Sequence, residues 1–257
     1  MKEEKKMSRS NDDGHTVQAY GDLGKWSRRN LLRGAALVSS KLLCAAPGLL
    51  VLKGCSRETQ RLDALYGLLA EEMDRESALR LFNRIAFHYA ELDSRKPHYA
   101  KWGMRFNIGN AILALAIYRA LGETGRTREA SITKAGELVW ATMPLWLFRK
   151  VFWFIGQFPD PFAAFVWFTR QQCKIMFPEP GWKRSYSETG NCFGFDVTRC
   201  LYIDYLTKEG APELVIAMCD LDYRTAELFP PDFYFKRTRC LAEGDTLCDF
   251  RYCRRRR

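Results

Sequence analysis

The sequence predicts an α+β protein, with a helical N-terminal half followed by a small antiparallel sheet with inserted helices. Three observations predict it. Apolar residues recur at offsets of three and four through residues 58–177, and short alternating runs separated by turn residues follow Pro178. In addition, 47% of the 257 residues are apolar, which is ample for a packed core. We expect residues 58–257, comprising a helical region (58–177) and an α+β unit (178–257), to form one compact domain.

Residues 1–57 resemble a leader that precedes this domain. The pair Arg28 and Arg29 stands ahead of a weakly apolar stretch that ends near Cys55, as in a twin-arginine export signal. Leu52 to Cys55 also resembles a lipidation site, although Lys53 stands where such a site has a small or apolar residue. The alternative is a disordered basic arm with a short amphipathic helix. The leader predicts an exported or membrane-associated protein that meets the export machinery. Without an export signal, the protein would be cytoplasmic.

The net charge of +10 is concentrated at the two ends of the chain. Residues 1–57 carry eleven Lys and Arg against five Asp and Glu, and residues 58–257 carry twenty-nine against twenty-five. The final four arginines, 254–257, account for that remaining excess. Because the folded part has no basic stripe interleaved with aromatic residues, we expect no nucleic-acid partner.

Amphipathic helices account for the first part of the domain. Asp74 and Thr127 precede apolar repeats as N-cap residues, and Gly122 ends a repeat over residues 105–121. His88 and His98 are ten residues apart and lack the short spacing of a helical metal pair, so we interpret both as structural.

The segment 144–177 is the most apolar of the domain. Asp160 and Pro161 suit an N-cap and a first helical position, which predicts two short aromatic helices in a hairpin. One interpretation is a hairpin buried in the core. The other is a lid or an anchor at a membrane surface, because Trp and Phe with a few basic residues are typical of interfacial helices.

The pattern changes after Pro178. Residues 182–188 and 192–197 read as strands around a turn, and Thr198 is expected to cap a helix that runs to Gly210. Pro212 and Glu213 open another helix. Residues 233–253 are expected to form a last hairpin, with Gly244 in its turn.

Cysteines, carboxylates and arginines gather in this last third, in the segments FGFDVTRC (193–200), PELVIAMCDLD (212–222) and RTRCLAEGDTLCDFRYC (237–253). Sulfur, acid and base within a short span are typical of a reactive or metal-binding pocket. The cysteine spacing is irregular and contains no CxxC pair, which favours mostly free thiols. Cys173, Cys192 and Cys253 are interpreted as small buried hydrophobic residues.

These segments resemble the C-terminal signature of the L-2-amino-thiazoline-4-carboxylic acid hydrolase family. The resemblance covers roughly residues 60–257, and YRALGETGRTREA (118–130) is similar to a helical segment of that family. GDTLCDF (244–250) alone is less specific, because 4-vinyl reductase-type small-molecule-binding domains end in a similar turn. The family name implies hydrolytic ring opening of a small cyclic isothiourea.

Such a reaction needs an activated water, a cation for the substrate carboxylate and stabilisation of a tetrahedral intermediate. One hypothesis is that three cysteines bind zinc; another is that Cys200 is a nucleophile whose pKa is lowered by Arg199 and a helix start at Thr198. The candidate zinc ligands are Cys200, Cys219 and Cys248. The candidate general bases are Asp220, Asp222 and Asp249. The candidate substrate-binding residues are Thr198, Arg199 and Arg239.

Two alternatives to an enzyme remain at this stage. One is a non-catalytic small-molecule or metal-binding protein that has kept the pocket. The other is a membrane-tethered accessory protein that docks a partner or a membrane surface through residues 144–177.

Overall fold

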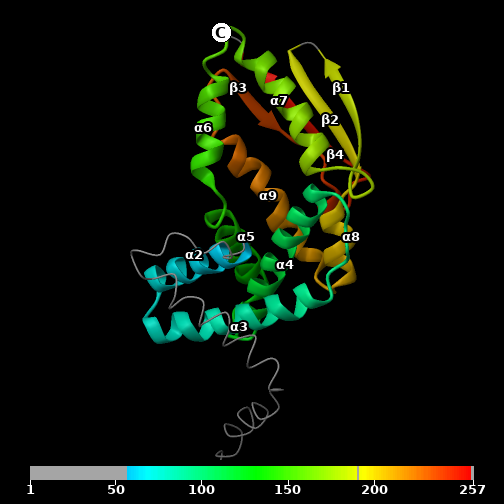
Figure 1. The fold of residues 1–257 in the computed structure, drawn as a ribbon. Helices are drawn as coiled ribbons and strands as arrows, with labels where there is room; N and C mark the ends of the chain where they lie inside the picture. The colour runs from blue at the N-terminus through cyan, green and yellow to red at the C-terminus, as the bar shows by residue number, and fades with distance from the viewer. Residues whose placement is uncertain (1–56, 190, 256–257) are drawn as a thin grey trace, which may run out of the picture. The chain divides into compact units, whose positions relative to one another are not determined.

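The computed structural model describes residues 57–189 and 191–255. The expected twin-arginine signal and Cys55 lie outside these residues, as do the last two arginines. The predicted α+β class is confirmed: helices come first in the chain, and a four-stranded antiparallel sheet lies in the C-terminal half (Figure 1).

Four helices build the first part of the domain. They are α2 (Arg57–Glu72), α3 (Arg75–Ser94), α4 (Trp102–Gly122) and α5 (Arg128–Ala141). Helix α4 lies at the centre, because it packs against α3, α5, α7 and α8. Its apolar residues therefore surround the helix instead of forming one stripe, as expected for a helix buried on all sides.

Three of the predicted N-caps are confirmed. The side chains of Asp74, Thr127 and Asp160 each accept a hydrogen bond from the backbone N–H three residues further on. Each bond satisfies one of the N–H groups that a helix start leaves without a partner, which stabilises the helix by about 1 kcal/mol.

The start of α4 lies very close to the end of α7. Asn107 donates hydrogen bonds to the carbonyl oxygens of Gly103, at 2.8 Å, and Met176, at 2.6 Å. A Cβ atom at Gly103 would lie only 2.1 Å from the carbonyl oxygen of Ile175. Only glycine allows the two backbones to approach in this way.

Replacing Gly103 by alanine should therefore destabilise the protein by about 3 kcal/mol or more, because the clash is with backbone. Gly109→Ala on the same helix is the matched control. A Cβ there meets nothing within 4 Å, so we expect a gain of about 0.5–1 kcal/mol from the better helix former. Urea unfolding measures both variants. Similar free energies of unfolding would contradict this packing.

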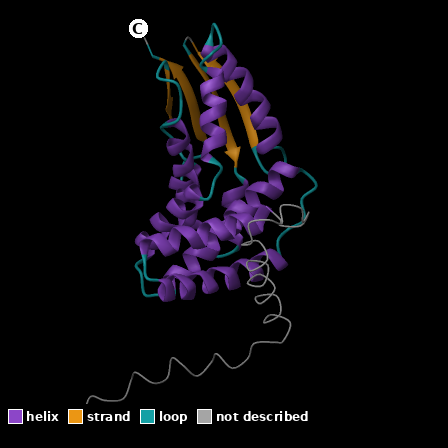
Figure 2. Ribbon diagram, turned by 60° about the vertical axis from the view of Figure 1, so that its left-hand side comes forward, coloured by secondary structure: helices purple, strands orange, loops and turns teal. Residues whose placement is uncertain are grey.

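The sheet has the strand order β1-β2-β4-β3, and every neighbouring pair is antiparallel. Its strands are β1 (Lys183–Thr189), β2 (Cys192–Arg199), β3 (Phe233–Lys236) and β4 (Cys248–Arg254). One face is aromatic, and α7 (Pro161–Met176) packs on it (Figure 2). The ring of Phe165 on α7 lies 4.7 Å from that of Phe233 and 5.2 Å from that of Tyr252, between centroids.

The helix expected from Thr198 to Gly210 begins later than predicted. Strand β2 continues to Arg199, which lies opposite Lys183 of β1, so strand pairing prevails over the capping tendency of Thr198. Helix α8 then spans Leu201–Lys208. Helix α9 (Val215–Ala226) follows a 3₁₀ turn at Pro212–Leu214, close to the predicted start.

Cys192 and Cys253 form a disulfide bond, so the prediction of two free buried thiols is wrong for this pair. The two residues lie directly opposite each other on β2 and β4, with Cα atoms 4.1 Å apart. Their separation of 61 residues gave no signal before the strand pairing was known. The other described cysteines are free thiols: Cys173, Cys200, Cys219, Cys240 and Cys248.

Helices α6 (Leu145–Ile155) and α7 form the expected hairpin, with the break at Asp160. It is only partly a core element: Phe152 and Ile155 of α6 are buried, whereas its tryptophans are exposed. No single helix in the described part of the chain is long and apolar enough to cross a membrane. Helices α5 and α6 together have the length and composition of a membrane span, but they are bent by 65° relative to each other.

Candidate functional site

An ion pair between Asp222 and Arg237 is the centre of the candidate site. Asp222 lies on α9, and Arg237 directly follows β3. Nη1 of Arg237 lies 2.8 Å from Oδ2 of Asp222, and its Nη2 donates to the carbonyl oxygen of Cys219 at 3.4 Å. The guanidinium also lies over the rings of Tyr223 and Phe250, at 5.0 and 5.5 Å from their centroids. Only 4% of the Arg237 side chain is exposed, so its position is fixed by packing.

Asp222 lies in largely desolvated surroundings, but part of its side chain remains exposed to solvent. Burial raises the pKa of Asp222 to about 7, even though Arg237 opposes the change. Burial also raises the pKa of Cys173 and of Cys200 to about 11, and the charge of Asp222 adds to both increases. The carboxyl group is therefore close enough to Cys173 and Cys200 for its charge to act on both thiols. Since 37% of its side chain remains exposed, it can exchange protons with a small molecule or a water.

Three thiols meet beside this pair. The Sγ atoms of Cys219 and Cys240 lie 3.8 Å apart, and Cys240 also forms a side-chain hydrogen bond with Cys248. The backbone N–H of Leu241 donates to Sγ of Cys248 at 3.2 Å. Cys219 comes from α9, Cys248 begins β4, and Cys240 lies in the segment between β3 and β4. Three separate segments of the chain thus place their thiol groups in contact.

Within this thiol cluster, Cys240 is the group that favours the thiolate. Hydrogen bonds from Cys219 and Cys248 lower the pKa of Cys240, and the N–H of Ala242 and the charge of Arg237 lower it further. The same hydrogen bonds raise the pKa of Cys219 and Cys248, because each thiol must keep its proton to donate. A Cys240 thiolate in turn helps to raise the pKa of Asp222.

Two carboxylates hold the segment that carries Cys240. Asp249 accepts hydrogen bonds from the N–H and hydroxyl of Thr238 and from the N–H of Arg239, at 2.6–2.8 Å. Burial raises the pKa of Asp249, but these bonds prevail and keep it below its usual value. Asp245 accepts from the N–H of Cys240 at 2.7 Å. Asp249, a candidate general base in the sequence, is thus a buried carboxylate whose oxygens already accept three hydrogen bonds.

Cys200 is not a member of the hydrogen-bonded thiol cluster, although the charge of Asp222 acts on it. It is the N-cap residue of α8 and is hydrogen-bonded with Trp182. Burial raises its pKa, so the predicted lowering by Arg199 and a helix start at Thr198 is wrong. The helix begins after Cys200, and Arg199 pairs instead with Asp204, at 2.9 Å on the surface.

The remaining candidates lie at or near the surface. Thr198 is exposed and contacts the carbonyl oxygen of Lys183 at 3.5 Å. Asp220 is exposed on α9, two residues before Asp222. Arg239 is exposed beside Cys240, with its backbone held by Asp249. Its guanidinium has no ion-pair partner within residues 57–189 and 191–255 and is thus available to an anion.

The zinc site expected from Cys200, Cys219 and Cys248 does not fit the structure. Cys219 and Cys248 do lie in one cluster, but their common neighbour is Cys240. In the described ranges, no three His, Cys, Asp or Glu side chains are arranged to hold a metal ion. The donors present therefore do not support zinc binding.

Cys240 and Arg237 were not among the site residues predicted from the sequence. Both lie in the RTRC segment (237–240), from which only Arg239 was chosen. A usable signal existed, since Cys240 and Cys248 flank the turn at Gly244 and must return towards each other. Gly244 has φ +93°, which favours glycine and confirms its predicted place in a turn. Only the position of α9 shows that Arg237, and not Arg239, pairs with Asp222.

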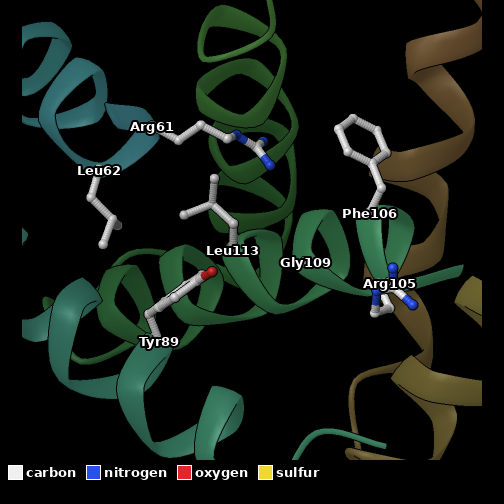
Figure 3. Close-up of a pocket in the computed structure, with 7 residues that line it drawn as sticks. All are labelled: Arg61, Leu62, Tyr89, Arg105, Phe106, Gly109 and Leu113. Carbon is white, nitrogen blue, oxygen red and sulfur yellow. The ribbon is translucent and has the colours of Figure 1, made fainter. Parts of the chain in front are cut away.

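Two hollows lie elsewhere on the domain. Figure 3 shows the first, lined by α2, α3 and α4 with Arg61 and Tyr89 at its sides; its volume of about 60 Å³ is far below the roughly 300–1,000 Å³ of ligand pockets. The second is an open groove of about 390 Å³ between α7 and the strands β1 and β2. Trp167 and Arg170 line it, and Arg170 is paired with Glu188.

Residues 148–252 match the model of the L-2-amino-thiazoline-4-carboxylic acid hydrolase family. The match runs from α6 to β4 and includes Asp222, Arg237 and all three members of the thiol cluster. Neither a curated protein nor a solved structure matches the chain. Over this region, which is less than half of the chain, the sequence is similar to the L-2-amino-thiazoline-4-carboxylic acid hydrolase family.

Proposed function

We propose that the protein is a hydrolase that opens a small cyclic isothiourea, such as 2-aminothiazoline-4-carboxylate, with Asp222 as the general base. The observation that carries the proposal is the combination found at Asp222: a pKa of about 7, a charge partner fixed by packing, and a side chain that solvent can reach. A base whose pKa lies near neutrality is best suited to proton transfer at that pH. The family match supports the reaction class.

In the proposed reaction, Asp222 removes a proton from water while the water oxygen bonds to the ring carbon between sulfur and nitrogen. The electron pair of the C=N bond moves to the ring nitrogen, which takes up the remaining proton of the added hydroxyl as the tetrahedral intermediate collapses to a C=O bond. The ring C–S bond breaks, and the leaving sulfur takes up the proton from Asp222. One water is consumed and an N-carbamoyl cysteine results. Asp222 ends in its starting state.

Arg237 supports this reaction by holding the base. It also offers a donor, because its buried Nε has no hydrogen-bond partner in the described part of the chain. Buried N–H groups normally have a hydrogen-bond acceptor. The Nε–H of Arg237, next to the base, is therefore suited to donate a hydrogen bond to negative charge that develops on a bound substrate. The thiol cluster acts through Asp222, since a Cys240 thiolate raises the pKa of the base.

Arg239 is the proposed site for the substrate carboxylate, because its guanidinium is exposed and its backbone is anchored by Asp249. We expect Arg239→Met to raise KM for 2-aminothiazoline-4-carboxylate about tenfold or more, with little change in kcat. Arg199→Met is the matched control and should leave both constants unchanged, since Arg199 pairs with Asp204.

The experiment uses the full chain purified under anaerobic conditions, with release of thiol from the substrate as the readout. Turnover that depends on enzyme concentration supports the proposal. Failure of the wild-type protein to release thiol, in a preparation that is folded and retains its free thiols, would contradict it.

A binding protein without turnover is the second candidate, and the groove at Arg170 is the observation that favours it. At about 390 Å³ the groove is large enough for a small ligand, and it is distinct from the Asp222 site. Ligand binding that persists without thiol release, and that is lost on Trp167→Ala, would support this alternative.

A further inference from the structure

Helix α6 exposes an apolar face to solvent. We define the α6 face as Trp146, Leu147, Trp153 and Phe154, of which the aromatic side chains are 62%, 67% and 58% exposed. Residues seven apart on a helix, such as Trp146 and Trp153, share one side, so the four form one surface. The opposite side of α6 is occupied by the core, through Phe152. Figure 1 shows α6 at the outside of the domain.

Such a surface is unusual for a protein that has no further contact to make. Single exposed apolar residues are common, but large aromatic patches mark interaction sites. Helix α6 has eleven residues and is thus about 16 Å long, half the roughly 30 Å of a bilayer core. It can lie along a membrane but cannot cross one by itself.

The charge around the α6 face is positive. Arg149 and Lys150 are exposed on α6, and Lys150 lies over the ring of Trp146, 5.2 Å from its centroid. The helix contains no acidic residue. Arg254, at the start of the final arginine run, reaches the turn that follows α6 and lies 2.6 Å from Asp160. Arg254 thus places a positive charge, paired with Asp160, at the turn between α6 and α7.

We propose that the α6 face docks on the surface of an anionic bilayer, with α6 in the plane of the interface. Trp and Phe side chains are suited to the boundary between headgroups and acyl chains, while Arg and Lys beside them extend to phosphate and carboxylate headgroups. The positive charge selects an anionic membrane over a neutral one. This inference is independent of the proposed function.

The test compares variants of the full chain by flotation with phosphatidylcholine vesicles and with vesicles that also contain phosphatidylserine. We expect Trp153→Ser with Phe154→Ser to reduce the partition into anionic vesicles about tenfold or more, since apolar area is lost. Arg149→Gln with Lys150→Gln should reduce binding to the anionic vesicles only. The control is Leu79→Ser with Trp102→Ser, two apolar residues on α3 and α4 that are each 45% exposed, which should change the partition less than about twofold.

Because all variants keep residues 1–56, any contribution of the leader is common to them. Brominated phospholipids provide a second readout that reports on α6 itself. The quenched fraction of tryptophan emission should fall in Trp153→Ser and should not fall in Trp102→Ser. Unchanged partition and unchanged quenching would overturn the proposal. So would self-association in lipid-free buffer, measured by sedimentation equilibrium, that depends on Trp153 and Phe154.

Discussion

Asp222→Asn should lower kcat/KM for ring opening by about 10²–10⁴-fold, the range expected when a general base is removed. Asparagine keeps the shape of the side chain and can still accept a hydrogen bond from Arg237, but it cannot take a proton from water. The loss should appear mainly in kcat, because the proposed carboxylate site at Arg239 is unchanged. Steady-state assays of thiol release measure it.

Asp220→Asn is the matched control for this prediction. Asp220 lies on the same helix, two residues earlier, and is exposed; its charge adds slightly to the raised pKa of Asp222, so the two variants are compared above pH 7. We expect its kcat/KM to stay within about twofold of the wild-type value. Equal losses in both variants would show that the charge of α9 matters, and not a base at Asp222.

Arg237→Met should affect both stability and catalysis. Methionine fills part of the apolar space above Tyr223 and Phe250 but leaves the Asp222 carboxylate without its partner. Removing one member of a buried pair costs about 3–5 kcal/mol, and the 37% exposure of Asp222 lowers this to about 2–3 kcal/mol of unfolding free energy. Since Arg237 lowers the pKa of Asp222, its loss should raise that pKa further.

Denaturant unfolding and the pH dependence of kcat/KM test this prediction together. Activity of Arg237→Met should need a higher pH than wild type to develop. Arg237→Lys keeps the charge without the two-pronged geometry, so its stability should be intermediate. A methionine variant as stable as wild type, with an unshifted pH profile, would contradict the assigned role of Arg237.

Local signals allowed much of the fold to be predicted. N-caps at Asp74, Thr127 and Asp160 depend on a side chain and a backbone N–H three residues away, so sequence alone reveals them. The start of α8 and the Cys192–Cys253 disulfide could not be predicted in this way. Both depend on which strands pair in the sheet, and this pairing joins residues far apart in the chain.

The candidate site was also predicted only in part, because some of its residues meet through long-range packing. The family signature placed Asp222 among the candidate bases, but its neighbours Arg237 and Cys240 were not predicted. Cys240 and Arg237 become members of the site only because α9 packs against the segment after β3. Cys200 had an equally suggestive neighbourhood in the sequence, and burial gives its thiol the opposite pKa shift from the one predicted.

The pH dependence of kcat/KM for thiol release by the wild-type full chain tests the central claim most directly. A base works only when deprotonated, and burial moves the pKa of Asp222 from 3.8 to about 7. We therefore predict that kcat/KM rises about tenfold per pH unit below neutrality and levels off above about pH 7. A profile that is already flat between pH 5 and pH 7, or one whose rise persists unchanged in Asp222→Asn, would contradict the account.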